Sequence, residues 1–305
     1  MGAVQEIDET AGGIELGPDV CRCPRCGSAD LVSSDKGATS CPACGTPVAA
    51  VDGVLECFPG SDTQRRYWDS HFQSADLSRL VLALEAGFAN RRLILAHYPV
   101  ARAMENLGRT LDSSIELGCG SGAFSLVLKR MGYVRRVTLV DYSRASLAAA
   151  RALFDRFSET AELVHATLDG LPFAGASFDL ALSGGVIEHY RSRPERLACL
   201  EAHLDAAPLA FVQAPVSSPF YWFSRLVYTA IKRGWPYGYE RPVTMSELNA
   251  LAGLAGATIL RRDHQYFSSF PMFTRFHRLP HPGWYTWPLQ NEIAVLARRG
   301  PERVA

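Results

Sequence analysis

The sequence predicts an α/β fold in which a doubly wound, parallel sheet follows a small cysteine-rich domain and carries an aromatic helical lid. Three observations favour this fold. Short apolar runs alternate with helical stretches through the middle of the chain, six of the eight cysteines lie between Cys21 and Cys57, and aromatic residues gather between Phe220 and Trp287. We expect two domains, formed by residues 1–60 and 61–305.

The composition is that of an ordinary globular protein. The 305 residues include 31 basic and 31 acidic side chains, and 48% of the residues are hydrophobic, which rules out a wholly disordered chain. The neutral total argues against a protein that holds nucleic acid mainly through bulk charge. Prolines break the longest uncharged run, and the N-terminus lacks the features of a signal peptide. We therefore expect a cytoplasmic protein without a membrane span.

The apolar runs predict the strands of the sheet. They follow two helical regions, at 63–72 and 77–107, and helical stretches separate them, a pattern typical of a parallel sheet. We place the lid at about 216–256 and 263–290, with the last two strands closing the sheet around it. The predicted strands cover residues 114–117, 137–140, 163–166, 178–183, 209–214, 258–262 and 293–297.

Two copies of one short turn stand in the N-terminal domain. Cys23 and Cys26 enclose Pro-Arg, Cys41 and Cys44 enclose Pro-Ala, and a glycine follows each pair. Thiolates at this spacing converge on one tetrahedral ion, and the glycine permits the positive φ that turns N–H groups toward sulfur. We predict a structural Zn²⁺ bound by all four thiolates, because the domain is too small to fold by burial alone. Free or disulfide-linked thiols are the alternative interpretation.

The stretch from Cys23 to Phe58 resembles the short zinc-ribbon family that is fused to, or partnered with, methyltransferases. The similarity continues after the second cysteine pair, through Pro47 and the Val51-Asp52-Gly53-Val54 turn.

A glycine loop opens the second domain. Gly118, Gly120 and Gly122 follow a predicted strand, and alternate glycines let a ligand approach the backbone closely. The loop alone also fits a dinucleotide site. Glu116 argues against pyrophosphate, because an anion would lie beside the phosphates, whereas S-adenosylmethionine carries an ammonium and a sulfonium. Asp141 ends the next strand, where a carboxylate can accept hydrogen bonds from both ribose hydroxyls.

Together with the downstream segments 168–173, 177–180 and 188–189, these residues resemble the small-molecule branch of the class I S-adenosylmethionine-dependent methyltransferases. The resemblance implies a Rossmann-like sheet of seven strands, the last one antiparallel. It also implies contacts to the methionine part, then ribose, then adenine, in chain order. The implied cofactor site comprises Glu116, Gly118, Cys119, Gly120, Gly122, Asp141, Tyr142, Leu168 and Asp169.

His189 and Glu188 are the candidate catalytic residues, because their segment leaves the fourth predicted strand at its carboxyl edge, where doubly wound folds bind ligands. A base is needed when the acceptor is a hydroxyl or a protonated amine. The alternative is that both residues only buttress the cofactor pocket.

The lid supplies the candidate substrate residues, and its arginines and aromatic rings suit an acidic or aromatic organic acceptor. They would also suit RNA bases or a helix that lies at a membrane surface. The candidates are Tyr190, Trp222, Tyr237, Tyr239 and His264.

These observations favour O- or N-methylation of a small or medium metabolite, possibly in a biosynthetic pathway. The sequence also allows an RNA methyltransferase that uses the ribbon to hold RNA. Residues 1–60 hold nine acids and three bases, a net charge of −6, and a module that grips phosphate should be basic. A non-catalytic scaffold with the same fold and a nicotinamide enzyme are the remaining hypotheses.

Overall fold

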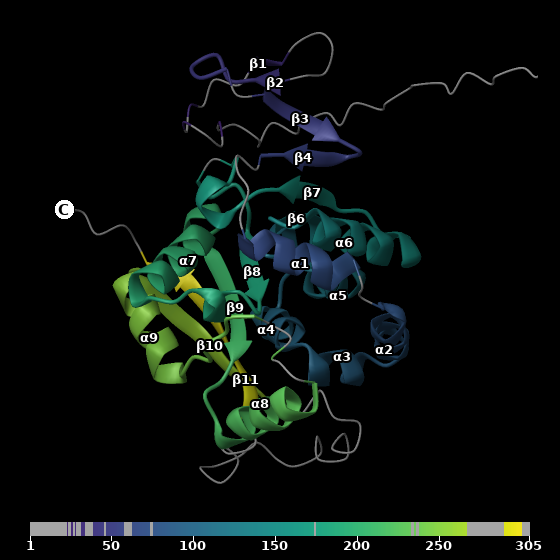
Figure 1. Ribbon diagram of the computed structural model, residues 1–305, viewed down its shortest axis with the longest axis vertical. Coiled ribbons are helices and arrows are strands. Elements are labelled where there is room, and N and C mark those ends of the chain that lie inside the picture. Colours follow the sequence, from purple (N-terminus) through teal and green to yellow (C-terminus); the bar gives the residue numbers. More distant parts are fainter. Residues whose placement is uncertain are drawn as a thin grey trace, which may run out of the picture.

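The protein is represented by a computed structural model that describes residues 23, 26, 28, 32–33, 39–45, 47–57, 63–73, 76–173, 175–232, 235, 238–266 and 290–300. Within this part of the chain, eleven strands form one sheet in the order β1-β2-β3-β4-β7-β6-β5-β8-β9-β11-β10 (Figure 1). The strands are β1 (Val32–Ser33), β2 (Thr39–Ser40), β3 (Pro47–Val51), β4 (Val54–Glu56), β5 (Leu111–Leu117), β6 (Val134–Asp141), β7 (Glu162–His165), β8 (Leu180–Gly184), β9 (Leu209–Pro215), β10 (Ala257–Tyr266) and β11 (Gln290–Arg299).

The centre of the sheet is parallel and doubly wound, as the sequence predicts. β5 pairs in parallel with β6 on one side and with β8 on the other, so the chain reverses its direction of winding at β5. β11 lies antiparallel to both β9 and β10. In a doubly wound sheet, the point of reversal opens a crevice at the carboxyl ends of the strands.

Successive residues of the central strands pack on opposite faces of the sheet. Leu139 and Leu182 belong to one core cluster, whereas Val140 and Ala181 belong to another. Both faces are therefore covered, which explains why these strands read as continuous apolar runs in the sequence.

Helices cover the two faces of the sheet. Helices α5 and α6 contact β6, α7 contacts β8 and β9, and α9 contacts β10 and β11 (Figure 1). The helices are α1 (Thr63–Gln73), α2 (Ser78–Ala89), α3 (Arg91–His97), α4 (Pro99–Leu107), α5 (Ala123–Arg130), α6 (Arg144–Arg156), α7 (Arg193–Ala206), α8 (Pro219–Lys232) and α9 (Met245–Leu254), with short 3₁₀ turns η1 (Leu168–Gly170) and η2 (Ile187–His189).

The cysteine-rich domain extends the sheet, and the strand count is therefore eleven rather than the expected seven. Strand β4 pairs in parallel with β7, so that Leu55 lies opposite Val164. At the same junction, Nδ1 of His165 lies 2.7 Å from Oε2 of Glu56, and Nε2 of His165 lies 3.1 Å from the carbonyl oxygen of Tyr142. Through His165, Glu56 of the cysteine-rich domain is therefore linked to the backbone of Tyr142, which belongs to the expected adenine site.

The region predicted as one helical stretch at 77–107 is three helices. Asn90 is extended, and its side chain accepts a hydrogen bond from the backbone N–H of Arg92, which caps α3. Pro99 then begins α4, where its missing N–H leaves no hydrogen bond unmade. A side-chain cap and a proline therefore set the two breaks.

In the lid, α8 and α9 lie within the first predicted segment, 216–256, and most of the second segment, 263–290, lies outside the described residues. None of the described helices has the length and apolar character needed to cross a membrane.

Candidate active site

The glycine loop has the backbone that the spacing predicts. Gly118, Gly120 and Gly122 have φ values of +67°, +52° and +71°, a region that residues with a Cβ rarely adopt. A Cβ added at Gly118 would also lie 2.7 Å from Cγ2 of Val186. The backbone therefore comes close to the β8–η2 turn here, and glycine is required for both reasons.

Asp141 holds this loop from the end of the neighbouring strand. Its Oδ2 accepts a hydrogen bond from the N–H of Gly120 at 2.9 Å, and its Oδ1 accepts one from the N–H of Ser143 at 2.8 Å. Burial raises the pKa of this carboxyl to about 6, although both backbone hydrogen bonds oppose the shift. Burial therefore disfavours the ionised form of Asp141, and a ligand that donates hydrogen bonds to its carboxylate would stabilise that form.

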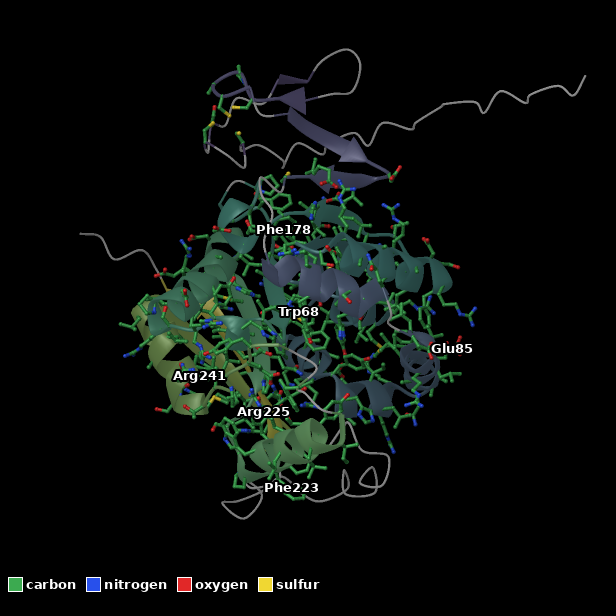
Figure 2. The ribbon with its side chains drawn as sticks, in the orientation of Figure 1. Trp68, Glu85, Phe178, Phe223, Arg225 and Arg241 are labelled. Carbon is green, nitrogen blue, oxygen red and sulfur yellow. The ribbon has the colours of Figure 1, made fainter. Side chains whose placement is uncertain are left out.

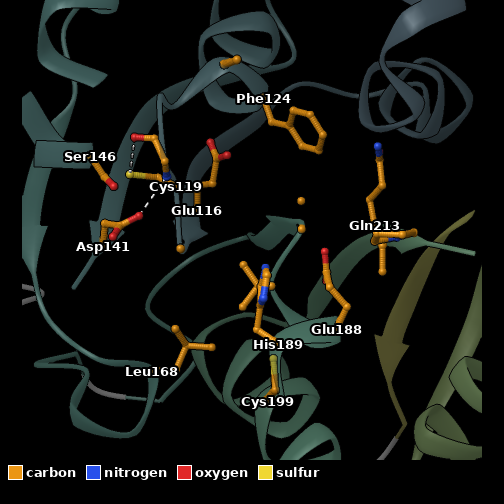
Figure 3. Close-up of a pocket in the computed structure, with 18 of the residues that line it drawn as sticks. Glu116, Cys119, Phe124, Asp141, Ser146, Leu168, Glu188, His189, Cys199 and Gln213 are labelled. Atoms are coloured by element: carbon orange, nitrogen blue, oxygen red, sulfur yellow. Dashed lines mark hydrogen bonds between the residues drawn. The ribbon is translucent and has the colours of Figure 1, made fainter. Parts of the chain in front are cut away.

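Glu116 lies on β5 beside the same loop (Figure 3). It is 3% exposed, and its Oε2 accepts a hydrogen bond from the N–H of Ser125 at 2.9 Å. Burial raises its pKa to about 7, and the charge of Asp141 adds to the effect. Glu116 therefore caps α5, and it also places a second buried carboxyl beside the glycine loop.

One cavity collects the predicted cofactor residues, with one exception. Gly122 faces the core instead, where an added Cβ would lie 3.0 Å from Leu139 and 3.2 Å from Phe154. Its role is to let α5 pack on the sheet. The residues that line the cavity are Glu116, Gly118, Cys119, Gly120, Asp141, Tyr142, Leu168 and Asp169.

With this geometry established, the chain can be compared with known proteins. Residues 115–204 match the family model described as "Methyltransferase domain". Over residues 115–204, the chain carries a methyltransferase domain. The match covers the glycine loop, Asp141, Asp169 and the candidate catalytic pair, so the predicted cofactor site lies within the methyltransferase domain. A search of curated proteins finds no significant match.

Solved structures show the same fold at low sequence identity. A chain from the complex that contains the Haloferax volcanii Trm112 methyltransferase activator is 16% identical, with a TM-score of 0.50 over 80% of this chain and 100% of that one. The cyclopropane synthase MmaA2 from Mycobacterium tuberculosis is 14% identical, with a TM-score of 0.50 over 78% of this chain and 94% of that one. At such identities the likeness concerns the methyltransferase fold alone.

His189 lies in the cavity wall, but both its surroundings and its hydrogen bond are those of a buttress. Its Nδ1 donates to the carbonyl oxygen of Tyr239 at 2.6 Å, and its ring meets Trp68 edge-on, with centroids 5.3 Å apart. Burial lowers its pKa, although the carbonyl of Tyr239 opposes the shift. The imidazole thereby fastens the lid segment at Tyr239 to η2.

Glu188, the other candidate, also lines the cavity (Figure 3). It is 2% exposed, and burial raises its pKa well above the usual range for a carboxyl. Among the described residues, its buried Oε2 has no hydrogen-bond partner. A buried oxygen of this kind can accept a hydrogen bond from a ligand.

The candidate substrate residues are not gathered as expected. Tyr190 lines the cavity, whereas Trp222, Tyr239 and His264 are not among its lining residues. Trp222 is 50% exposed and donates to Ser217, and Tyr239 packs under the guanidinium of Arg191 at 4.6 Å. Tyr237 lies outside the described residues.

Arg225 on α8 also differs from the expectation of a cationic substrate pocket. Arg225 lies on α8, and its guanidinium donates to the hydroxyl of Tyr221 and to the carbonyl oxygen of Glu240. The guanidinium carbon lies 5.2 Å from the centroid of the Trp235 ring. In Figure 2, Arg225 points into the molecule while Phe223 lies on the outer side of α8. Arg225 thus builds the lid and does not line the cavity.

The sequence did not point to several lining residues, including Phe124, Gln213, Glu240 and Glu292. They come from separate segments and form no local motif. Gln213 and Glu292 are polar residues near the ends of predicted strands, and this is the one signal in the sequence that could have found them.

The four predicted zinc ligands are brought together. Cys23 and Cys44 have sulfur atoms 3.5 Å apart, as do Cys26 and Cys41, and all four atoms lie within 4.8 Å of one another. Figure 2 shows the sulfur atoms gathered at one end of the ribbon. Zn–S bonds of about 2.3 Å in a tetrahedron require sulfur atoms about 3.8 Å apart, so the cluster fits one Zn²⁺.

Proposed function

We propose that this chain transfers the methyl group of S-adenosylmethionine to a small or medium organic metabolite. The observation that supports it most strongly is the pairing of Asp141 with Gly120 near the buried Glu116, inside the segment that matches a methyltransferase domain. Two buried acids side by side suit a cofactor that carries positive charge and would repel a pyrophosphate. These two acidic acceptors therefore fit S-adenosylmethionine.

Each part of the site has a role in this reaction. Asp141 would accept from the ribose hydroxyls, and Tyr142, Leu168 and Asp169 would surround the adenine. When bound, S-adenosylmethionine supplies a methyl group that its sulfonium activates for transfer. The task of the protein is to orient the acceptor and exclude water. The buried wall formed by η2 and the lid serves both purposes.

Between the candidate catalytic residues, we assign proton removal to Glu188 and positioning to His189. When Glu188 is ionised, its unpartnered Oε2 can take a proton from the substrate that receives the methyl group. The hydrogen bond from His189 to Tyr239 is already made and holds the lid in place. This division of roles follows the hydrogen bonds of the two side chains.

We further propose that the ribbon binds one structural Zn²⁺ through Cys23, Cys26, Cys41 and Cys44. A closed shell of four thiolates leaves no position for a substrate, so the ion stabilises the ribbon and takes no part in methyl transfer.

Isotope-labelled S-adenosylmethionine tests the proposed reaction. The protein is incubated with methyl-labelled cofactor and a fractionated mixture of small metabolites, and labelled products are separated by mass. A labelled small molecule that depends on the intact protein supports the proposal. Transfer to RNA alone, or no transfer to any fraction, contradicts it.

A further inference from the structure

A group of hydrogen-bond acceptors lies in the cavity beyond the cofactor residues. Glu188 comes from η2, Gln213 from β9 and Glu292 from β11, and all three line the cavity. β9 and β11 pair so that Gln213 lies opposite Ala294 and Glu292 opposite Pro215. Alternate residues share a face, so Gln213 and Glu292 point to the same side of the sheet.

This group adjoins the loop that holds the cofactor. The carbonyl oxygen of Gln213 accepts a hydrogen bond from the N–H of Gly185 at 3.0 Å. A Cβ at Gly185 would lie 3.4 Å from Oε1 of Glu188, and Val186, the next residue, packs against Gly118. The acceptor group and the glycine loop therefore flank one turn, between β8 and η2.

The group is short of donors. Gln213 is 5% exposed, and its Nε2 donates to Oε2 of Glu292 at 2.5 Å, which leaves its own Oε1 buried. Within the described part of the chain, neither Oε1 of Gln213 nor Oε2 of Glu188 has a hydrogen-bond partner. Figure 3 shows both side chains extending to the same side, toward Phe124. Buried acceptors without donors are costly unless a ligand completes them.

Acidic side chains outnumber basic ones in the cavity wall. The one arginine among the described lining residues, Arg299, pairs with Asp205 at the rim. Burial raises the pKa of Glu188 and of Glu292, and the charge of Glu240 adds to each shift. The described carboxylates of the lining are Glu116, Asp141, Asp169, Glu188, Glu195, Glu201, Asp205, Glu240 and Glu292.

Glu240 links this group to the aromatic part of the wall. It is 6% exposed, and its carboxylate accepts from the hydroxyl of Tyr221 at 3.0 Å and from Nε1 of Trp235 at 2.8 Å. Phe124 lines the same cavity, and its ring lies where a Cβ at Gly184 would clash. Aromatic faces beside carboxylates attract organic cations.

We propose that the acceptor substrate carries an ammonium group, which binds among Glu188, Gln213 and Glu292 while its carbon skeleton packs against the aromatic wall. An ammonium brings several N–H donors and a positive charge, the two things that this group lacks. The assignment reverses the acidic acceptor expected from the lid arginines. It rests on the proposed methyltransferase function, whose substrate class it names.

The test is equilibrium binding, measured by calorimetry at neutral pH on the full chain. The probes are 2-phenylethylamine and n-butylamine, with 2-phenylethanol as the neutral analogue and 3-phenylpropionate as the anionic one. We expect at least one amine to bind, and at least tenfold more tightly than either analogue. Glu188→Gln and Glu292→Gln should each weaken amine binding at least tenfold. Glu85→Gln should not change it, because Glu85 pairs with Arg156 and is not among the lining residues of the cavity.

S-adenosylmethionine is titrated into the same samples, which separates the two proposals. Cofactor binding without amine binding overturns the ammonium site and leaves the methyltransferase function standing. Amine binding without cofactor binding overturns the methyltransferase function and leaves the ammonium site standing. Tighter binding of 3-phenylpropionate, or unchanged amine binding in both glutamine variants, also overturns the site. Thermal unfolding of each variant verifies that the near-isosteric substitutions leave the fold intact.

Discussion

Oδ2 of Asp141 accepts a hydrogen bond from the backbone N–H of Gly120 at 2.9 Å. The acid at the end of β6 therefore holds the loop at the end of β5, and the two strands share one site at the centre of the sheet. A substitution at Asp141 consequently affects both the loop and the ligand that the loop approaches.

Asp141→Asn is expected to weaken S-adenosylmethionine binding by about 1–3 kcal/mol, the scale for lost hydrogen bonds to a charged group. The asparagine amide would bring an N–H group toward the N–H of Gly120 or Ser143, each of which now donates to this carboxylate. Calorimetry measures the change. Asp155→Asn, on the exposed surface of α6, is the matched control, and equal affinities in the two variants would mean that the ribose site is misplaced.

Cofactor affinity is expected to fall as the pH falls below about 7, because the pKa is raised to about 7 at Glu116 and to about 6 at Asp141. Where binding requires a deprotonated acid, each pH unit below its pKa costs about a factor of ten in affinity. In the absence of cofactor, the stability of the fold changes with pH in the opposite direction to the cofactor affinity. The folded protein holds these protons more tightly than the unfolded chain, so the free energy of unfolding falls as pH rises from about 4 to 7.

Calorimetry from pH 5 to pH 8, in two buffers of different ionisation enthalpy, follows both affinity and proton release. Asp141→Asn should flatten the part of the profile near pH 6. An affinity that is level across the range would contradict the involvement of the two acids.

His189→Asn is expected to retain turnover within about tenfold, because the asparagine amide can replace Nδ1 as the donor to Tyr239. His189→Phe keeps the ring but lacks the donor, so it should lose more activity and lower the thermal midpoint. A loss of roughly 10²–10⁴ in the asparagine variant would be the signature of a general base. Turnover is measured on the acceptor found with labelled cofactor.

Removal of zinc is expected to unfold the ribbon. The purified protein should contain one zinc per chain, and Cys41→Ser should lose the metal and lower the thermal midpoint, because metal binding and folding are coupled in such small domains. Cys57→Ser is the control, since this buried thiol lies outside the four-sulfur cluster. Metal analysis decides the matter, and a zinc-free protein with an unchanged melting curve would refute the assignment.

Much of the fold is predictable because its determinants are local. The strand at 137–140 is predictable from its apolar run, and the loop at Gly118 from its glycines and the strand before it. Where packing decides, the sequence is less informative. The break at Asn90 depends on one side-chain cap, and the pairing of β4 with β7 joins segments more than a hundred residues apart.

The site divides in the same way. The cofactor residues are found because they follow strands in chain order, and each β–α turn delivers them to one edge. The group of hydrogen-bond acceptors formed by Glu188, Gln213 and Glu292 cannot be found in this way. Gln213 and Glu292 are 79 residues apart in the sequence and meet only when β9 pairs with β11. Arg225 misleads the sequence interpretation, since nothing in the sequence around it shows that it faces Tyr221 and Glu240.

The most direct test of the whole account is a calorimetric titration of the zinc-loaded protein with S-adenosylmethionine, beside an identical titration with NADH. We predict one S-adenosylmethionine site per chain, weakened in Asp141→Asn, and no heat of binding from NADH. Binding of NADH with no response to S-adenosylmethionine would contradict the account, because it would place a pyrophosphate against Glu116.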